Sequence, residues 1–160
     1  MTKKVAVDTP DFDSTSIVRF GAIEMNSASE LVFYTQAFNG QPYAHVRWFI
    51  KSDGYSGPTR KGIMLSKEQL ASLVGVLQQF HENNQLTIRP RELGRIPKND
   101  KTEFVISLVS NRKGEMRLDV RLFAISLTYE GPTKKGVRVE LSRLPETIDN
   151  LSRMAAHLGN

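Results

Sequence analysis

The sequence predicts an α+β fold made of two repeats, each a β-sheet followed by a helix. The first observation is internal repetition. The segment YSGPTRKGIML at 55–65 recurs as YEGPTKKGVRV at 129–139, and VRWF at 46–49 recurs as VRLF at 120–123. Both recurrences have an offset of 74 residues, which indicates a duplication. The second observation is that strand-like runs precede an amphipathic helical pattern in both halves. We therefore expect an acidic flexible tail (1–16), a first sheet-helix repeat (17–82), a basic linker (83–101) and a second repeat (102–160).

The first repeat contains turn and cap signals that separate its elements. Strands rich in β-branched and aromatic residues are predicted at 17–25, 31–38, 42–51 and 61–65. Asn39-Gly40 is typical of a two-residue type I′ turn, in which both positions need positive φ. Ser66 and Gln69 predict a helix start with a capping box. The helix then shows one apolar stripe, which must be buried: Leu70, Leu73, Val74, Leu77 and Phe80.

The second repeat follows the same plan. Its strands are expected at 102–110, 115–126 and 135–141, and the linker is a candidate source of its first strand. Ser142 is the expected cap of the last helix, and Pro145 falls in the first turn, where a missing amide costs little. The apolar positions of this helix are Ile148, Leu151, Ala155 and Leu158.

The charge balance suits a polyanionic partner. Lys and Arg number 22 against 17 Asp and Glu, a formal charge of +5, and most of this excess lies in the second half of the chain. There is no cysteine, which excludes disulfides and thiolate metal sites. The first residues place acids where a secretory signal needs an apolar run, and no stretch approaches the ~20 apolar residues of a membrane helix. We expect a cytoplasmic protein, associated with the nucleoid if it is bacterial.

Alternation along the third strand predicts one apolar and one basic-aromatic face. Tyr43, His45, Arg47, Phe49 and Lys51 oppose Val46, Trp48 and Ile50, and in the second repeat Arg117, Asp119, Arg121 and Phe123 share the outer face. Exposed bases of single strands stack on rings while cations follow the phosphates. The alternative is an ordinary half-exposed sheet surface, with its arginines paired to nearby acids.

Two cation pairs stand at equivalent loop-to-strand junctions. Arg60-Lys61 and Lys134-Lys135 each follow Gly-Pro-Thr and precede Gly, so backbone amides at the same place can also face an anion. We interpret them as phosphate contacts, with a solvated turn as the alternative. Phe38 ends a strand beside the hairpin, where an exposed ring would be a stacking platform. Trp48 is assigned to core or inter-repeat packing.

Signals for catalysis are weak. His45, His81 and His157 are scattered without metal-ligand spacing, and no phosphate-binding loop or nucleophile elbow is present. The glycines of GPTRKG precede a strand rather than a helix, unlike those of a P-loop. We expect no enzymatic activity, no metal and no cofactor.

Residues 33–74 resemble the positive cofactor 4 family of transcriptional coactivators and single-stranded-DNA-binding proteins. The resemblance lies in the F-x-G-x hairpin, the V-R strand, the G-x-[RK]-K-G-I-x-L strand and the S-x-E-Q helix start, and it is weaker over 107–154. It implies a strongly curved four-stranded antiparallel sheet followed by a C-terminal helix. Such units usually form homodimers, so two repeats in one chain imply an intramolecular pseudo-dimer.

The resemblance also implies a set of nucleic-acid contacts. By motif position these are Phe38, Arg47, Arg60, Lys61, Lys113, Arg121, Lys134 and Lys135, to which the outer-face residues Phe49 and Lys51 and the hairpin residue Arg112 are added as candidates. The chain departs from the family at Asn39 and Gln41, where lysines are common, and at Arg112, where Phe is expected. These departures predict weaker or unequal binding by the two repeats, or a different ligand.

The expected function is non-catalytic, largely sequence-independent binding of single-stranded DNA, with RNA left open, in transcription, replication or repair. Transcription or replication proteins are candidate partners, and further self-association is left open. The alternative is a protein-interaction or scaffold module that kept the fold but lost most nucleic-acid contacts.

Overall fold

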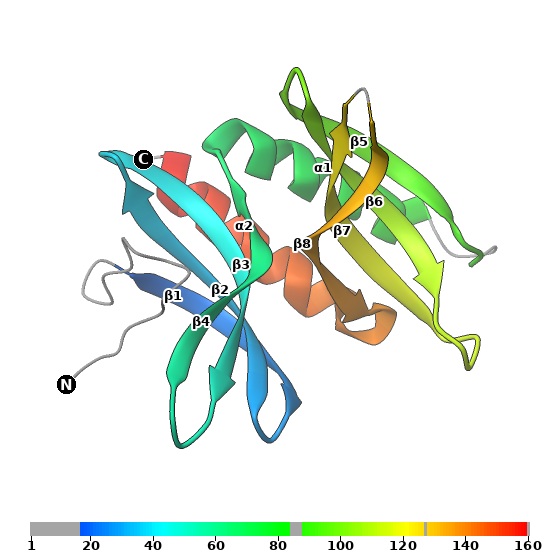
Figure 1. The fold of residues 1–160 in the computed structure, drawn as a ribbon. Helices are drawn as coiled ribbons and strands as arrows, with labels where there is room; N and C mark the ends of the chain where they lie inside the picture. The colour runs from blue at the N-terminus through cyan, green and yellow to red at the C-terminus, as the bar shows by residue number, and fades with distance from the viewer. Residues whose placement is uncertain (1–16, 84–87, 127, 160) are drawn as a thin grey trace.

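Each half of the molecule is a four-stranded antiparallel sheet followed by a helix (Figure 1). The structure is a computed structural model that describes residues 17–83, 88–126 and 128–159. The first sheet, in the order β1-β2-β3-β4, consists of β1 (Val18–Asn26), β2 (Ser29–Phe38), β3 (Gln41–Lys51) and β4 (Ser56–Leu65), and α1 (Lys67–Asn83) follows it.

The second sheet repeats this order as β5-β6-β7-β8. It consists of β5 (Arg91–Asn99), β6 (Thr102–Ser110), β7 (Met116–Ile125) and β8 (Glu130–Glu140), followed by the 3₁₀ turn η2 (Leu141–Arg143) and α2 (Leu144–Gly159). The predicted α+β class and the two sheet-helix repeats are confirmed. The segment 83–101, expected as a linker, contributes β5, the first strand of the second sheet. The predicted tail, 1–16, lies outside the described residues.

The two repeats share a single hydrophobic core. Leu31, Phe33 and Val46 of the first sheet lie in the same buried cluster as Ile106 and Val120 of the second. The two helices pack against each other, and β4 lies against β8. Pooling both sheets buries a larger apolar fraction than either module would bury alone, which is the advantage expected of pairing two small units. The chain is thus an intramolecular pseudo-dimer.

Each helix also crosses to the first strand of the other repeat. Helix α1 contacts β5, and α2 contacts β1, β2 and β3. The crossing points are equivalent, because Gly21 and Gly94 both lie at irregularities of their strand pairing. An added Cβ at Gly21 would lie 2.6 Å from Asn150 Oδ1, and one at Gly94 would lie 3.3 Å from a methyl of Val76. Glycine therefore allows the close approach of helix to strand in both halves.

The local signals of the first repeat are confirmed. Asn39 and Gly40 have φ of 52° and 79°, as a type I′ turn requires. Gln69 N–H donates to Ser66 Oγ at 3.1 Å, and Ser66 N–H donates to Gln69 Oε1 at 2.9 Å, which is a complete capping box. In the second repeat the predicted Ser142 cap is wrong: Ser142 lies in η2 and the helix begins at Leu144.

The capping box makes a small contribution to stability that can be measured. Replacing Ser66 by Ala should lower the free energy of unfolding by about 1 kcal/mol, because a donor at the start of α1 loses its acceptor. Urea unfolding measures this loss. Ser72→Ala at an exposed position of the same helix is the control, and an equal effect of both changes would mean that the capping box contributes nothing.

None of the described helices combines the length and the apolar composition needed to cross a membrane.

Candidate nucleic-acid interface

The GPT[RK]KG segments form a bulge in the same place in both sheets. Along β3–β4 the pairing steps from Arg47–Gly62 to Phe49–Pro58, so β4 holds extra residues opposite one position of β3. The β7–β8 pairing steps in the same way from Arg121–Gly136 to Phe123–Pro132. We call the extra segments, Thr59–Lys61 and Thr133–Lys135, the two bulges. A bulge re-aims side chains at the point where it interrupts the ladder.

The same hydrogen bonds hold both bulges. Thr59 Oγ donates to the carbonyl of Trp48 at 3.0 Å and accepts the amide of Lys61 at 3.1 Å. Thr133 Oγ donates to Leu122 O at 2.7 Å and accepts the amide of Lys135 at 3.1 Å. The repeated threonine thus fixes the backbone on which the second cation of each pair stands.

An arginine of the neighbouring strand completes each bulge. Arg47 Nη1 donates to Thr59 O and Arg121 Nη1 donates to Thr133 O, each at 3.0 Å. The expectation that Arg47 and Arg121 serve only as contact residues is therefore incomplete, since each guanidinium already supports the bulge beside it. Removing either one would perturb the neighbouring cations as well as any contact of its own.

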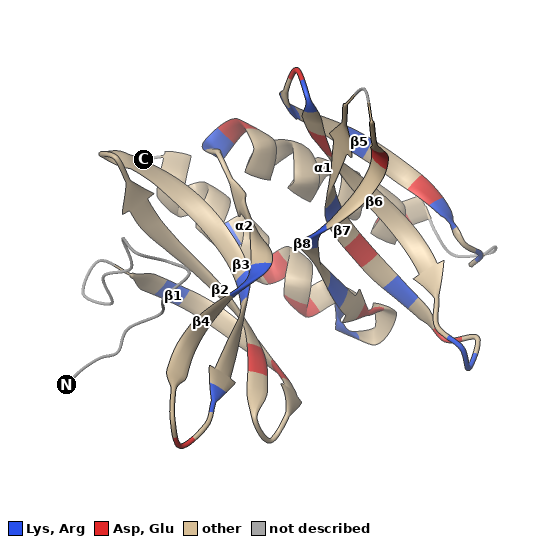
Figure 2. Ribbon diagram, in the orientation of Figure 1, with Lys and Arg blue, Asp and Glu red and all other residues tan. Residues whose placement is uncertain are grey.

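The four cations of the two bulges are exposed, and they stand on two strands that contact each other across the repeats. Arg60, Lys61, Lys134 and Lys135 are all solvent-exposed, and β4 and β8 are in contact. Figure 2 shows blue segments on β4 and β8 near the centre of the molecule, where these strands approach each other. Within the described ranges, the ion pairs involve neither Lys61 nor the two lysines of the second bulge. These lysines are available to an anionic ligand.

Each bulge ends at a glycine for steric reasons. A Cβ at Gly62 would lie 2.6 Å from Val46 O and 2.8 Å from Arg47 Cα, and one at Gly136 would lie 2.9 Å from Val120 O. The strand next to the bulge therefore approaches too closely for any side chain.

Replacing Gly62 by Ala should lower the free energy of unfolding by about 2 kcal/mol, because backbone atoms must move to make room. The matched control is Gly75→Ala in α1, where nothing lies within 4 Å of the added Cβ. That change should instead stabilise the protein by up to about 1 kcal/mol, the helix-propensity difference. Thermal unfolding of both variants measures the contrast, and a neutral Gly62→Ala would disprove the tight approach.

The outer face of the first sheet is rich in rings. Phe38, at the end of β2, is 39% exposed, and its ring meets that of Tyr43 edge-on at 6.4 Å. Phe49 meets Tyr34 edge-on at 5.6 Å, and Tyr34 stacks on His45 at 4.7 Å. The predicted basic-aromatic face is thus present, and it is more aromatic than basic. Lys51 is exposed, with its Nζ 3.9 Å from Glu30.

Tyr34 and His45 lie on this face but are buried, at 1% and 7% exposure. Burial and the positive charge of Arg47 lower the pKa of His45 to about 4, against a smaller opposing effect of the Gln36 backbone. Burial raises the pKa of Tyr34, while the charge and hydrogen bond of Arg47 act in the opposite direction. These two rings therefore support the face from within, whereas Phe38 is open to a ligand.

Ion pairs cover much of the outer face of the second sheet. Asp119 is 5% exposed and accepts hydrogen bonds from both Arg121 and Arg138, at 3.0 and 3.1 Å to its Oδ1. Arg95 pairs with Glu92 and Glu103. The alternative reading of the sequence, arginines paired to nearby acids, thus describes this face well.

The loop between β6 and β7 differs from its counterpart in the first repeat. Ser110 pairs with Met116, so five residues connect the strands where Asn39-Gly40 suffices in the first repeat. The strand register shows that the offset between the repeats is not constant. Val32 pairs with Arg47, and Val105 pairs with Arg121. Equivalent residues of β3 and β7 are therefore 74 positions apart, whereas those of β2 and β6 are 73 positions apart. Arg112 and Lys113 are exposed in this loop. The expectation that Arg112 replaces the strand-end Phe is therefore wrong, and the structural counterpart of Phe38 is Asn111.

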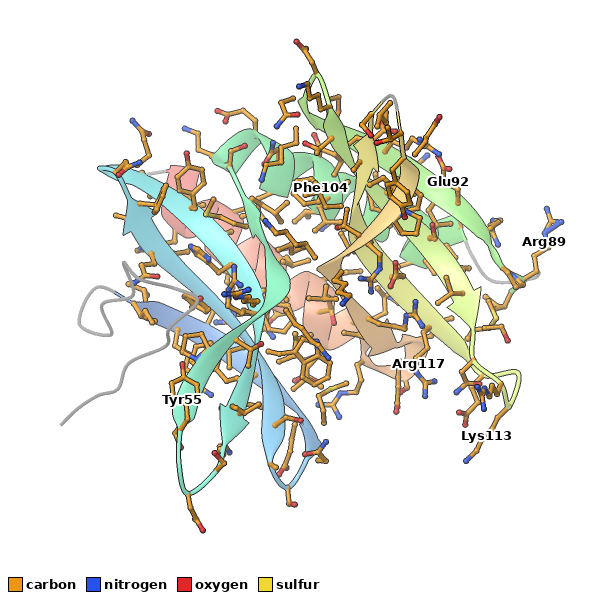
Figure 3. The ribbon with its side chains drawn as sticks, viewed as in Figure 1. Tyr55, Arg89, Glu92, Phe104, Lys113 and Arg117 are labelled. Carbon is orange, nitrogen blue, oxygen red and sulfur yellow. The ribbon has the colours of Figure 1, made fainter. Side chains whose placement is uncertain are left out.

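Figure 3 shows where the labelled cations of the second half of the chain lie. Lys113 and Arg117 stand at the β6–β7 end, while Arg89 projects from the outer edge of the molecule. The eleven predicted site residues are therefore not all in one place. The two bulges stand on contacting strands, whereas Phe38 and the Arg112–Lys113 loop lie at hairpin ends of separate sheets.

Lys98 and Arg138 are two further cations of the second sheet that the sequence did not predict as site residues. Burial and the charge of Lys135 lower the pKa of Lys98, whose Nζ lies 5.8 Å from the centre of the Phe104 ring. No sequence spacing links Lys98 to Lys135, because they stand on β5 and β8, at opposite ends of the strand order. Arg138 alternates with buried Val137 and Val139, a signal that was available in the sequence. No group of three or more metal-ligating side chains occurs among the described residues.

Comparisons with known proteins complete the description of the site. No curated protein matches the chain. Among solved structures, the crystal structure of WHY3 from Arabidopsis thaliana is similar at a TM-score of 0.39 and 12% identity, over 88% of each chain. Residues 26–76 match the family model described as Transcriptional Coactivator p15 (PC4). This match, which runs from the end of β1 into α1, confirms the resemblance seen in the sequence: the first repeat is similar to the PC4 family.

Proposed function

We propose that this protein binds single-stranded nucleic acid without catalysing a reaction, and that it acts in transcription regulation, replication or repair. The family whose model matches residues 26–76 is described as a transcriptional coactivator, which supports a role in transcription. DNA is the preferred ligand in this proposal, and RNA is the competing polymer to test beside it. Cytoplasmic partners of the transcription or replication machinery are a further part of the proposal.

The observation that carries the proposal is the duplicated cationic bulge. Two pairs of exposed cations, each placed by the same threonine and arginine hydrogen bonds, stand on strands that contact each other. Lysines and backbone amides at such irregular turns are suited to phosphate oxygens. A polymer with regularly spaced phosphates can contact both bulges at once, which a small anion cannot do.

The rings of the first sheet favour an unpaired strand over a duplex. Phe38 is an exposed ring at a strand end, with Tyr43 beside it. Base stacking on such rings requires bases that are not enclosed in a double helix. A duplex would present the same phosphates but no free base faces, so we expect it to bind more weakly.

The test is fluorescence anisotropy with single- and double-stranded oligonucleotides of one sequence across a salt series. If about five phosphates are contacted, log affinity should fall with log salt at a slope near −3.5, from about −0.7 per contact. The single strand should bind more tightly than the duplex. A flat salt response, or a preference for the duplex, would contradict the proposal.

A second candidate function is a protein-interaction or scaffold module. It is favoured by the outer face of the second sheet, where Arg121 and Arg138 already pair with the same carboxylate of Asp119. Under this alternative the oligonucleotide would bind weakly, and replacing the bulge lysines would not change its affinity. Arg47 and Arg121 are less suitable for this test, because each also supports a bulge.

A further inference from the structure

We propose that the two repeats divide the work of binding: the first supplies the base stacking, and the second supplies the larger share of the phosphate contacts. This inference rests on the proposed function, and it goes beyond it by assigning different parts of the ligand to the two halves. The strand pairing identifies equivalent positions in the two repeats. The inference follows from three differences between side chains at such positions.

The first difference lies at the β2–β3 and β6–β7 hairpins. In the first repeat the exposed ring of Phe38 meets the half-buried ring of Tyr43 edge-on. By strand register their counterparts are Asn111 and Arg117. Asn111 Nδ2 donates to Glu115 Oε1 at 2.7 Å, and Arg117 lies 3.5 Å from the same carboxylate. The second hairpin therefore offers polar and charged groups where the first offers two rings.

The second difference concerns the phenylalanine that both repeats keep. Phe49 and Phe123 occupy equivalent positions, each opposite a proline of the last strand. The guanidinium of Arg95 lies 6.0 Å from the centre of the Phe123 ring and is held by Glu92 and Glu103. The strand pairing makes Ala22 the counterpart of Arg95. Ala22 pairs with Val32, which in turn pairs with Arg47. In the same way Arg95 pairs with Val105, which pairs with Arg121. A cation therefore lies near the ring in the second repeat, whereas the equivalent position in the first repeat, Ala22, carries no charge.

The third difference strengthens the cationic side of the second repeat. The Nζ of Lys98 lies 5.8 Å from the centre of the Phe104 ring, and burial together with repulsion by the charge of Lys135 lowers the pKa of Lys98. An anion between two such lysines relieves this repulsion. The counterpart of Lys98 is Met25. Met25 directly follows Glu24, which pairs with Glu30, and Lys98 directly follows Pro97, which pairs with Glu103 at the equivalent place in the second sheet. The second repeat thus carries Lys98, Lys134 and Lys135 at the positions where the first repeat carries Met25, Arg60 and Lys61.

A homodimer of identical modules would treat both halves of a bound strand alike. In this chain the base-dependent part of the affinity should come from the first repeat, and the larger share of the salt dependence from the second. The two contributions can be separated, because an abasic strand keeps its phosphates but offers no ring to stack on.

The experiment compares a short single-stranded oligonucleotide with an abasic strand of the same length. Wild-type protein should prefer the normal strand by about tenfold, which corresponds to stacking of about one base. Phe38→Ala with Tyr43→Ala should remove this preference and leave the salt slope unchanged. Lys134→Gln with Lys135→Gln should keep the preference and reduce the slope by about 1.4, the share of two phosphate contacts.

An exchange between the repeats provides the matched control. Lys98→Met should lower the salt slope by about 0.7, and Met25→Lys should raise it by a similar amount. If the ring variant keeps the base preference, or the lysine variant alone abolishes it, the division of work is wrong. If wild-type protein binds neither strand, the proposed function fails instead, so the two failures are distinguishable.

Discussion

Replacing Arg60, Lys61, Lys134 and Lys135 together by Gln is expected to weaken single-strand binding roughly a hundredfold at physiological salt. Each lost phosphate contact removes about 0.7 from the salt slope, and four such losses amount to about two decades at that ionic strength. Folding should be unchanged, because all four side chains are exposed and the bulges are held by threonine and arginine.

Fluorescence anisotropy at constant salt measures this loss. The control variant removes four other cations, Lys67, Arg89, Lys101 and Arg143, and therefore has the same net charge. It should lose far less affinity, since only the long-range field changes. Equal losses in the two variants would mean that net charge rather than the bulges attracts the nucleic acid.

Acidification should destabilise the protein through His45 by about 3 kcal/mol. The pKa of this side chain is about 4 in the folded state, below the unfolded value of about 6.5, so the folded protein holds the neutral ring. Its contribution is fully present above pH 6.5 and is lost as the pH falls from there toward 4, because the unfolded chain binds the proton more readily. The cause is burial of the ring against Tyr34 beside the charge of Arg47.

Urea unfolding between pH 7 and pH 4 measures this dependence. His45→Phe keeps a ring against Tyr34 but cannot be protonated, so its stability should fall less over the same interval. The carboxylates titrate in both proteins and cancel in the comparison. Identical pH profiles for the wild type and His45→Phe would show that His45 is not held neutral by the fold.

The elements of the first repeat were predictable because their signals are local. A type I′ turn needs positive φ at two successive residues, and Asn39-Gly40 meets that need without any tertiary contact. The Ser66–Gln69 capping box is likewise complete within four residues. The start of β4 was placed too late, at 61 instead of Ser56, because the glycines and proline before the bulge are typical of a loop.

The second repeat was harder to predict because its signals depend on pairing. Arg112 was assigned by an ungapped alignment, and only the strand register reveals the longer loop that shifts the equivalence to Asn111. Ser142 has the chemistry of a cap, yet η2 places it before the helix begins. The tertiary arrangement, not the local sequence, decides both positions.

The candidate site was predictable in its residue types but not in their pairing. The duplicated motif predicted the cations of the bulges, which are exposed on contacting strands. Alternation placed Asp119 on the outer face correctly, but no pattern shows that it would be buried and shared by Arg121 and Arg138. The effect of Lys135 on the pKa of Lys98 joins strands at opposite ends of the strand order and has no counterpart in sequence spacing.

Titration of isotope-labelled protein with a short single-stranded oligonucleotide, followed by the amide resonances of Lys61 and Lys135, is the most direct measurement. Both amides donate to the threonine of their bulge, so they report on any ligand held there. We expect both resonances to shift together and to saturate at one strand per chain. Shifts confined to the exposed sides of the two helices, with both bulge amides unmoved, would contradict the account.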